Sequence, residues 1–450
     1  MHRSLRAPLL LVVLWLLALP LAAQDAPDLT AEDVAIETRV DVYGLENTVA
    51  AGSLVNNGAQ ALSGVTVLAD VYAADDTLIG EGFGYLVNAC GAGLLPDYTL
   101  QPGHAQPFEV ILELYEQDAA IDRVDIRADG RPVESTVAAD PTPGITQVTD
   151  TEVVAVEWLD TRALRYAVGC ARNLFTDWDW FHYSGRTRAT LPVVHPRAAG
   201  VTQQLIDRMN VTEPGEIGAS MLQFAPTGTR LVYQGEINRF YTAEADGTFQ
   251  RVIYDHLYNR TLQGIQWLGG DVFLAYYYGA SGDPVYYFTA TAAGQPISLH
   301  PNNLPLSRIV PGVSPDGRRA VLAGTFDDQT GYFLQSLVND SSPQLLFEAE
   351  PPGNNWPAPL FQVVNGADAG SVAQDRVFFA RPVGGEARLF CYNLQNGGPV
   401  DLAPLPLTLG LDERASWWLS PDGATIALAA NGARGGLWLI DLTALPACAA

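Results

Sequence analysis

The residues best suited to binding a ligand lie in short loops between expected strands. Trp178 stands between Asp177 and Asp179, so one large ring and two carboxylates would meet solvent together. Tryptophan and arginine are over-represented among residues that dominate binding energy, which makes Trp178 the strongest single candidate. The alternative is that Trp178 alternates into the strand core, as we expect for Trp180. The other candidate ligand-binding residues are Tyr278, Asp283, Asp327, Asp328 and Arg434.

Tyr278 has a second interpretation, because it ends a run of three tyrosines at 276–278. Such a run can form an aromatic platform for a sugar or a peptide. It also suits strand residues that pack both faces of a sheet, and we favour that interpretation because tyrosine is enriched in strands.

The types and spacing of the other reactive residues disfavour an enzyme. All 25 cations are arginine, which excludes a Walker-type phosphate loop and Schiff-base or pyridoxal chemistry, since each needs a lysine. No G-x-S-x-G elbow and no H-E-x-x-H pair are present, so neither a serine hydrolase nor a zinc protease is predicted. Two carboxylates in the central funnel of a propeller would suit a glycan-active hydrolase or lyase. With 50 acidic residues, however, such pairs are expected by chance, so their presence does not indicate a glycosidase. We therefore predict no catalytic residue, no metal and no cofactor.

Two Asp-Gly turns, at Asp316 and Asp422, invite comparison with calcium sites. An EF-hand-like loop needs several acidic ligands spread over about 12 residues. Each of these turns offers a single acid before its glycine, so ordinary turn chemistry is the better interpretation.

The net charge limits the partners. A formal charge of -25 argues against duplex nucleic acid and against anionic lipid, because both attract cations. Charged residues make up only 17% of the chain and hydrophobic residues 48%, so a folded core is expected. The acids are spread along the chain rather than gathered in a tail, which indicates a solubilising surface.

Residues 1–23 resemble a secretory signal peptide. Arg3 and Arg6 form a basic start, an apolar run follows at 9–19, and small residues at 22–23 precede Gln24. The run is short for a membrane span, which takes about 20 residues. We expect a secreted, periplasmic or cell-surface protein with no membrane span in the mature chain. The alternative is an uncleaved N-terminal anchor.

Four cysteines suit disulfides in an exported protein, with three possible pairings. None are spaced as C-x-x-C, so zinc and dithiol redox sites are not predicted. We favour a disulfide between Cys90 and Cys170, because it would join the two predicted domains. Cys391 lies in an apolar strand pattern, where a buried thiol is the simplest expectation.

Residues 34–134 alternate like short strands and predict a small β-sandwich. An Asn-Asn-Gly turn at 56–58 ends one strand and predicts a hairpin. The stretch G-S-L-V-N-N-G at 52–58 resembles the opening of FxLYD-type domains, which are immunoglobulin-like modules of exported prokaryotic proteins. Tyr72 matches that family, whereas Ala69 and Ala73 depart from the Phe and Asp that name it. The resemblance implies a sandwich and no catalytic residues.

After a linker at 135–143, the chain at 144–448 repeats a unit of strands and turns. The repeat anchors stand at positions 158, 224, 267, 313, 364 and 419, with spacings of 66, 43, 46, 51 and 55. Periods of roughly 40 to 50 with about four strands each are typical of propeller blades. Six units predict an all-β protein in which an immunoglobulin-like sandwich precedes a six-bladed β-propeller.

The last unit lacks an outer strand, and residues 144–149 look like an orphan one. Supplying that strand from the start of the propeller would close the ring and remove an exposed edge. The Ser-Pro-Asp-Gly turns at 314–317 and 420–423 resemble the repeats of TolB-like proteins, the second more closely. That resemblance implies a six-bladed propeller in an exported protein and does not imply membership of the Tol complex.

The sequence favours a non-catalytic binding protein over an enzyme. In a propeller, the turns between second and third strands gather on one face, and the candidate residues occupy these turns. The expected partner is an extracytoplasmic protein, peptide or glycan, with no nucleic acid. The alternatives are a glycan-active hydrolase or lyase with carboxylates in the propeller funnel, and a structural cell-surface module.

Overall fold

The computed structural model describes residues 29–448 except 41–45, 89–92, 94–97, 117–118, 134–142, 170–177, 196–222, 226–228, 237–238, 256–261, 270, 279–284, 301–302, 352–355, 363–374, 385, 396, 408–414 and 431–434. The described residues form strands and turns, with one 3-10 helix at Leu442–Ala444 and no α-helix among them. None of their helices has the length and hydropathy to cross a membrane. The predicted signal peptide and nearly all of the predicted linker lie outside the described residues.

The chain divides into two compact units, residues 1–86 with 100–135 and residues 87–99 with 136–450. The strands of the first unit form one antiparallel sheet in the order β1-β2-β6-β4-β3-β5, with β7 also paired to β3. They are β1 (Leu29–Val40), β2 (Glu46–Asn56), β3 (Ala61–Tyr72), β4 (Leu78–Leu86), β5 (Thr99–Leu100), β6 (Ala105–Leu114) and β7 (Arg123–Val133).

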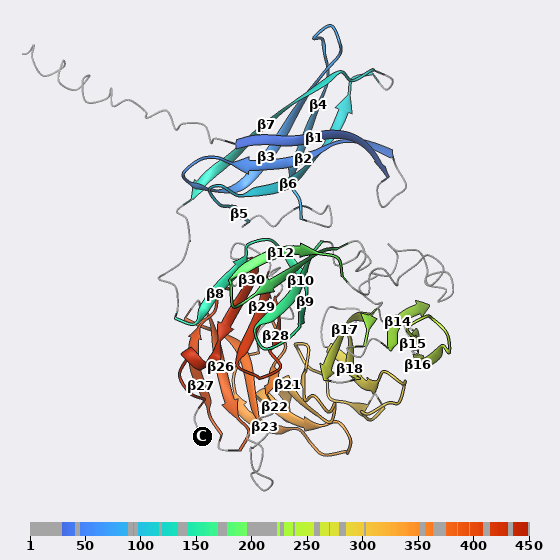
Figure 1. Ribbon diagram of the computed structural model, residues 1–450, viewed down its shortest axis with the longest axis vertical. Coiled ribbons are helices and arrows are strands. Elements are labelled where there is room, and N and C mark those ends of the chain that lie inside the picture. The colour runs from blue at the N-terminus through green and yellow to red at the C-terminus, as the bar shows by residue number, and fades with distance from the viewer. Residues whose placement is uncertain are drawn as a thin grey trace, which may run out of the picture. The chain divides into compact units, whose positions relative to one another are not determined.

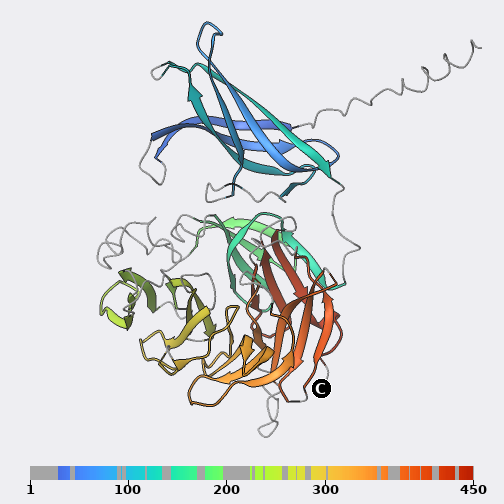
Figure 2. The ribbon, with the colours of Figure 1, turned by 180° about the vertical axis from the view of Figure 1, so that it is seen from behind.

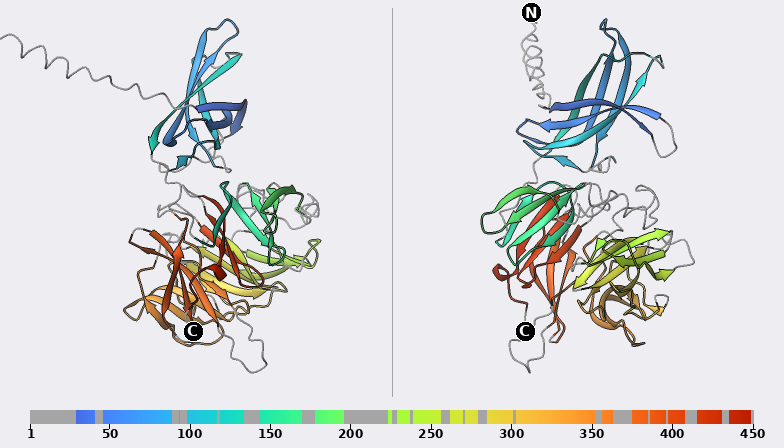
Figure 3. Two further views of the ribbon diagram at one scale, coloured as in Figure 1. Left: turned by 60° about the vertical axis from the view of Figure 1, so that its left-hand side comes forward. Right: turned by 45° about the vertical axis from the view of Figure 1, so that its right-hand side comes forward.

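Alternating residues of this sheet build its core. Val67, Ala69 and Val71 of β3 are at most 1% exposed, as expected for a strand with one buried face. The sheet curls. As a result β1, at one end of the pairing order, approaches β7, which pairs with β3 near the other end. Figure 3 shows β1 crossing over the other strands. Because all seven strands join one hydrogen-bonded sheet, the expected immunoglobulin-like sandwich is not confirmed.

The predicted hairpin at 56–58 is wrong. The turn connects β2 to β3, but β2 pairs with β1 and β6 and not with β3. The physical reason is the buried side chain of Asn56, which donates to the carbonyl oxygens of Gln60 (2.9 Å) and Leu100 (3.0 Å). The backbone N–H of Asn56 donates to the carbonyl of His104 instead of to β3. These bonds tie the end of β2 to the segment before β6.

The second unit contains six antiparallel sheets that form the blades of a propeller, as Figures 1 and 2 show. Blade 1 contains β9 (Val153–Trp158), β10 (Ala163–Val168), β11 (Asp179–Ser184) and β12 (Ala189–Val193). Blade 2 contains β13 (Gln223–Phe224), β14 (Arg230–Glu236), β15 (Arg239–Glu244) and β16 (Arg251–Asp255). The described part of blade 3 contains β17 (Leu262–Gly269), β18 (Val272–Tyr278) and β19 (Val285–Thr291).

The remaining blades have four strands each. Blade 4 contains β20 (Gly312–Val313), β21 (Arg319–Phe326), β22 (Gln329–Ser336) and β23 (Gln344–Glu348). Blade 5 contains β24 (Leu360–Gln362), β25 (Arg376–Val383), β26 (Glu386–Asn393) and β27 (Pro399–Pro404). Blade 6 contains β28 (Ala415–Leu419), β29 (Thr425–Ala430), β30 (Gly436–Asp441) and, out of chain order, β8 (Ile145–Thr149).

The apolar cores lie between the blades. Each of six buried clusters joins two successive blades, and the cluster of Val156, Tyr166 and Leu437 joins blade 6 back to blade 1. The first strands β20, β24 and β28 approach one another, which places the first strand of each of these blades innermost. Six interfaces between six blades make a closed ring and confirm the predicted six-bladed propeller.

The predicted closure of the ring is also confirmed. Strand β8 pairs with β30 as the outer strand of blade 6, and in Figure 1 the teal β8 lies beside the red β30. Gly436 permits this pairing, because a Cβ atom there would lie 2.0 Å from the carbonyl oxygen of Thr149. The start of the propeller therefore covers the edge that its end would expose.

A disulfide joins Cys391 of β26 to Cys448 near the C-terminus, with a Cα–Cα distance of 5.7 Å. The expectation of a free buried thiol at Cys391 is therefore wrong. Its apolar surroundings are consistent with either state, and only the fold brings the C-terminal segment back to blade 5. Cys90 and Cys170 lie outside the described residues. Of the three pairings, the observed bond leaves only Cys90 with Cys170, which stays a prediction.

Candidate functional site: the face of the second-to-third strand turns

The topology places one set of turns together. Every blade is antiparallel and its strands follow one another outward from the axis, so the turns between second and third strands share one face of the ring. We call this the upper face. Among the predicted site residues, Trp178, Asp179, Asp327 and Asp328 are described there. Asp177, Asp283, Arg434 and the side chain of Tyr278 lie outside the described part of the chain.

Trp178 directly precedes strand β11 at the upper face, and Asp179 is the first residue of that strand. Trp178 is partly buried and packs at the edge of the core between blades 1 and 2, with its ring centre 6.1 Å from that of Trp180. A Cβ at Gly169 would lie 2.9 Å from Trp178 Cδ1, so this glycine makes room for the ring. Asp179 is exposed. Trp180 is 6% exposed, which confirms the expected core position.

Asp327 and Asp328 form the two-residue turn between β21 and β22. Both are exposed and both have positive φ, 47° and 63°. A two-residue turn with positive φ at both positions is the type I′ hairpin, for which Asn-Gly is the usual sequence. A left-handed backbone costs most residues roughly 1–2 kcal/mol each, and aspartate tolerates it better than most but less well than glycine. The turn therefore presents two adjacent carboxylates in a conformation that another sequence would adopt more easily.

Arg381 was not predicted as a site residue. It lies at the upper end of β25 in blade 5, next to the blade that carries the Asp327–Asp328 turn. Its guanidinium carbon lies 5.2 Å from the ring centre of Phe390 and 5.8 Å from that of Phe347, so two aromatic faces hold the cation between blades 4 and 5. Its Nε is buried without a hydrogen-bond partner, and Arg381 makes no ion pair with any described residue. The interruption of the apolar strand 377–380 by an Arg-Pro pair was the available sequence signal.

Arg388 lies directly opposite Arg381 on β26 and differs in its pairing. Arg388 Nε donates to Asp401 Oδ2 at 2.7 Å, and its Nη1 lies 3.4 Å from Glu386 Oε2. Two like charges directly opposite on neighbouring strands destabilise a sheet. Arg388 is therefore neutralised by carboxylates, whereas no described carboxylate pairs with Arg381.

Tyr332 lies near Arg381 in the same interface. Its ring is fully buried, stacks on Phe347 at 4.8 Å and lies 5.1 Å from Phe379. Its hydroxyl has no hydrogen-bond partner among the described residues. Burial raises the pKa of Tyr332, and the positive charge of Arg381 acts in the opposite sense. Buried hydroxyls are normally hydrogen-bonded, so an unpartnered one calls for an explanation.

The innermost strands offer little for catalysis. Among their described residues, Glu157 of β9 is the only carboxylate. Both of its oxygens lie 3.2 Å from Nε2 of the buried His195, and Arg165 lies 3.8 Å away. A glycosidase needs two carboxylates that flank the scissile bond. The described inner strands contain no such pair, and Glu157 serves the contact between strands and the segment after β12.

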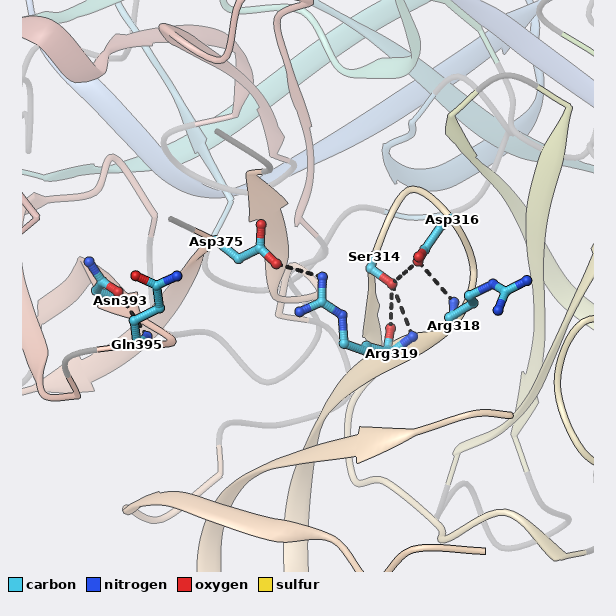
Figure 4. A network of polar contacts seen from close by, with 7 residues as sticks. All are labelled: Ser314, Asp316, Arg318, Arg319, Asp375, Asn393 and Gln395. Carbon is cyan, nitrogen blue, oxygen red and sulfur yellow. Dashed lines mark hydrogen bonds and ion pairs between the residues drawn. The ribbon is translucent and has the colours of Figure 1, made fainter. Parts of the chain in front are cut away.

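The Ser-Pro-Asp-Gly turns lie at the opposite ends of the blades and serve the fold. Figure 4 shows the first of them: Ser314 Oγ donates to Asp316 Oδ1 at 2.6 Å, and Asp316 also accepts the backbone N–H of Arg318 at 3.1 Å. Arg319 then reaches Asp375 of blade 5 at 2.5 Å. Asp316 therefore stabilises its own turn, and Arg319 joins blade 4 to blade 5.

The second turn repeats this arrangement. Ser420 Oγ donates to Asp422 Oδ1 at 2.6 Å, and this hydroxyl holds the pKa of Asp422 below its usual value. In Asp316 burial raises the pKa, but the hydroxyl of Ser314 and the backbone N–H of Arg318 lower it by more. No cluster of three metal-ligating side chains occurs among the described residues.

Comparison with known proteins finds fold similarity only. No family model matches the sequence, and no curated protein matches it. Among solved structures, the chain is similar to the Hadza microbial sialidase Hz136, with 8% identity, a TM-score of 0.39, and coverage of 88% of this chain and 96% of that one. It is also similar to TolB from Acinetobacter baumannii, with 10% identity, a TM-score of 0.23, and coverage of 64% and 78%. A further similar chain belongs to a nidogen/laminin complex, with 9% identity, a TM-score of 0.30, and coverage of 75% and 92%. None of these similarities bears on function.

Proposed function

We propose that this is an exported, non-catalytic binding protein that presents the upper face of its propeller to a protein, peptide or glycan. The observation that carries the proposal is the Asp327–Asp328 turn. Two exposed carboxylates stand side by side, at positive φ, where Asn-Gly would form the turn more easily. Strained backbone of this kind clusters at sites that bind ligands.

The contrast with the rest of the propeller supports this proposal. Asp316 and Asp422 are engaged within their own turns, and Glu157 contacts His195. Asp327 and Asp328 are instead exposed in the turn of the paired β21–β22 hairpin. Binding residues placed on loops above a rigid scaffold are the usual design of binding proteins.

Export and the nature of the first unit belong to the same proposal. The composition of residues 1–23 supports a cleaved signal peptide, and the G-S-L-V-N-N-G stretch supports an FxLYD-type module. A structural disulfide suits an oxidising compartment outside the cytoplasm.

A replacement that preserves the turn tests the function. D327N/D328G supplies the preferred type I′ sequence and removes both charges. The mature chain and this variant are compared on a glycan array and on an array of capped peptides. Loss of retention with an unchanged melting temperature supports the proposal. Equal retention of both proteins refutes it, and release of shortened glycans would favour the glycan-active enzyme instead.

A further inference from the structure

We propose that Arg381 and Tyr332 bind the carboxylate of an extended peptide, and that Asp327 and Asp328 bind a basic residue of the same peptide. This inference rests on the proposed function and assigns its ligand class.

Arg381 could bind an external anion, because no described residue of the chain pairs with it. Arg381 is held by the rings of Phe347 and Phe390 and has no carboxylate partner among the described residues, in a protein with 50 acids and 25 cations. Arg381 as a whole is partly buried, with its Nε inside the interface. Arginine binds carboxylates through two parallel hydrogen bonds, and aromatic stacking fixes the plane of the group.

The hydroxyl of Tyr332 supplies a second donor in the same interface. It is buried and unpartnered, and the charge of Arg381 acts on it. A carboxylate has two oxygens and about four acceptor sites, so it can accept from a guanidinium and a phenol together. Such an anion would also relieve the repulsion between Arg381 and the facing Arg388.

The surrounding charge selects among carboxylate ligands. The exposed acidic residues of blades 4 and 5 include Asp327, Asp328, Glu348 and Glu386, of which Glu386 also contacts Arg388. A polyanion such as a polyuronate would meet these carboxylates at close range and be repelled. A peptide that carries one carboxylate and one cation satisfies both the isolated arginine and the acidic turn.

The distance between the proposed carboxylate site and the Asp327–Asp328 turn determines how far apart the two charged residues of the peptide should stand. Tyr332 and Asp328 lie four residues apart along one hairpin, about 13 Å at the usual rise of a strand. An extended peptide covers that distance in about four residues. The expected ligand therefore carries an acidic and a basic residue about four positions apart.

The test uses the mature chain and capped heptapeptides in which glutamate and arginine stand four positions apart, in both orders, with neutral residues elsewhere. We expect binding in a titration, weakened about tenfold by R381Q, because hydrogen bonds to charged groups contribute on that scale. Replacing the glutamate of the peptide by glutamine should weaken wild-type binding equally and should not affect R381Q further. Y332F, which removes only the hydroxyl, should weaken binding severalfold without loss of stability.

R388Q is the matched control, since it removes the same charge from the facing strand but from a guanidinium that already has carboxylate partners. Its affinity should stay close to that of the wild type. Unchanged binding by both R381Q and Y332F, or no binding of either peptide order by the wild type, overturns the inference. Arg381-dependent binding of oligogalacturonate, without peptide binding, also overturns it in favour of an acidic glycan. If D327N/D328G loses its partner while R381Q and Y332F keep theirs, the proposed function stands and only this inference falls.

Discussion

The disulfide between Cys391 and Cys448 should carry a measurable share of the stability of the propeller. It closes a segment with a sequence separation of 57 residues and fixes the C-terminal segment to blade 5. For a loop of that length, the entropy removed from the unfolded chain corresponds to about 4 kcal/mol. Unfolding entropy of about 2.1 cal/mol/K per residue over roughly 300 residues converts this to a shift in melting temperature of about 6 °C.

The assay is a thermal melt of four proteins: the wild type, C391A, C448A and the double variant. Each single variant breaks the same bond, so each should lose most of the 6 °C, and the double variant should lose little more than either one. C391A should be slightly less stable than C448A, because Cys391 is fully buried and leaves a small cavity. Small, additive shifts from the two single variants would mean that no bond exists and would refute the reasoning.

Three other perturbations have defined outcomes. The pKa of Asp422 is lowered in the folded state, so its contribution to the free energy of unfolding is present at neutral pH and is lost as the pH falls below about 4. In thermal melts, D422N should therefore narrow the difference in stability between pH 7 and pH 3.5. An unchanged difference would contradict this role of Asp422. G436A should destabilise the propeller by more than about 1 kcal/mol, because its Cβ would lie 2.0 Å from the carbonyl oxygen of Thr149. Denaturant unfolding measures the change in stability. An unchanged free energy of unfolding would count against the closure of the ring by β8. Peptide mapping without reduction should recover Cys90 linked to Cys170, and two free thiols there would end that prediction.

The propeller could be predicted from the sequence because its signals are local and repeated. Each blade carries its own turn and apolar strand, so six weak patterns reinforced one another and the orphan strand at 145–149 identified the closure. The pairing of the first sheet depends instead on contacts distant in sequence. The Asn-Asn-Gly turn looked like a hairpin locally, and the bond from Asn56 to Leu100 decides the topology.

The candidate site was only partly predictable, because it also depends on contacts distant in sequence. Asp327 and Asp328 could be assigned to a turn, because their neighbours alternate like strands on either side. Arg381 could not be recognised as a candidate, because its significance depends on Phe347 from another blade and on the lack of an ion pair with any described residue. The disulfide likewise joins positions whose proximity appears only after the ring has closed.

The most direct test of the central claim is the retention of D327N/D328G relative to the wild type on the same glycan and capped-peptide arrays, with melting temperatures measured in parallel. We expect a defined subset of ligands to retain the wild type and not the variant. We expect the melting temperature of the variant to equal that of the wild type or to be slightly higher. Equal retention by two equally stable proteins would contradict the assignment of the upper face as the binding surface.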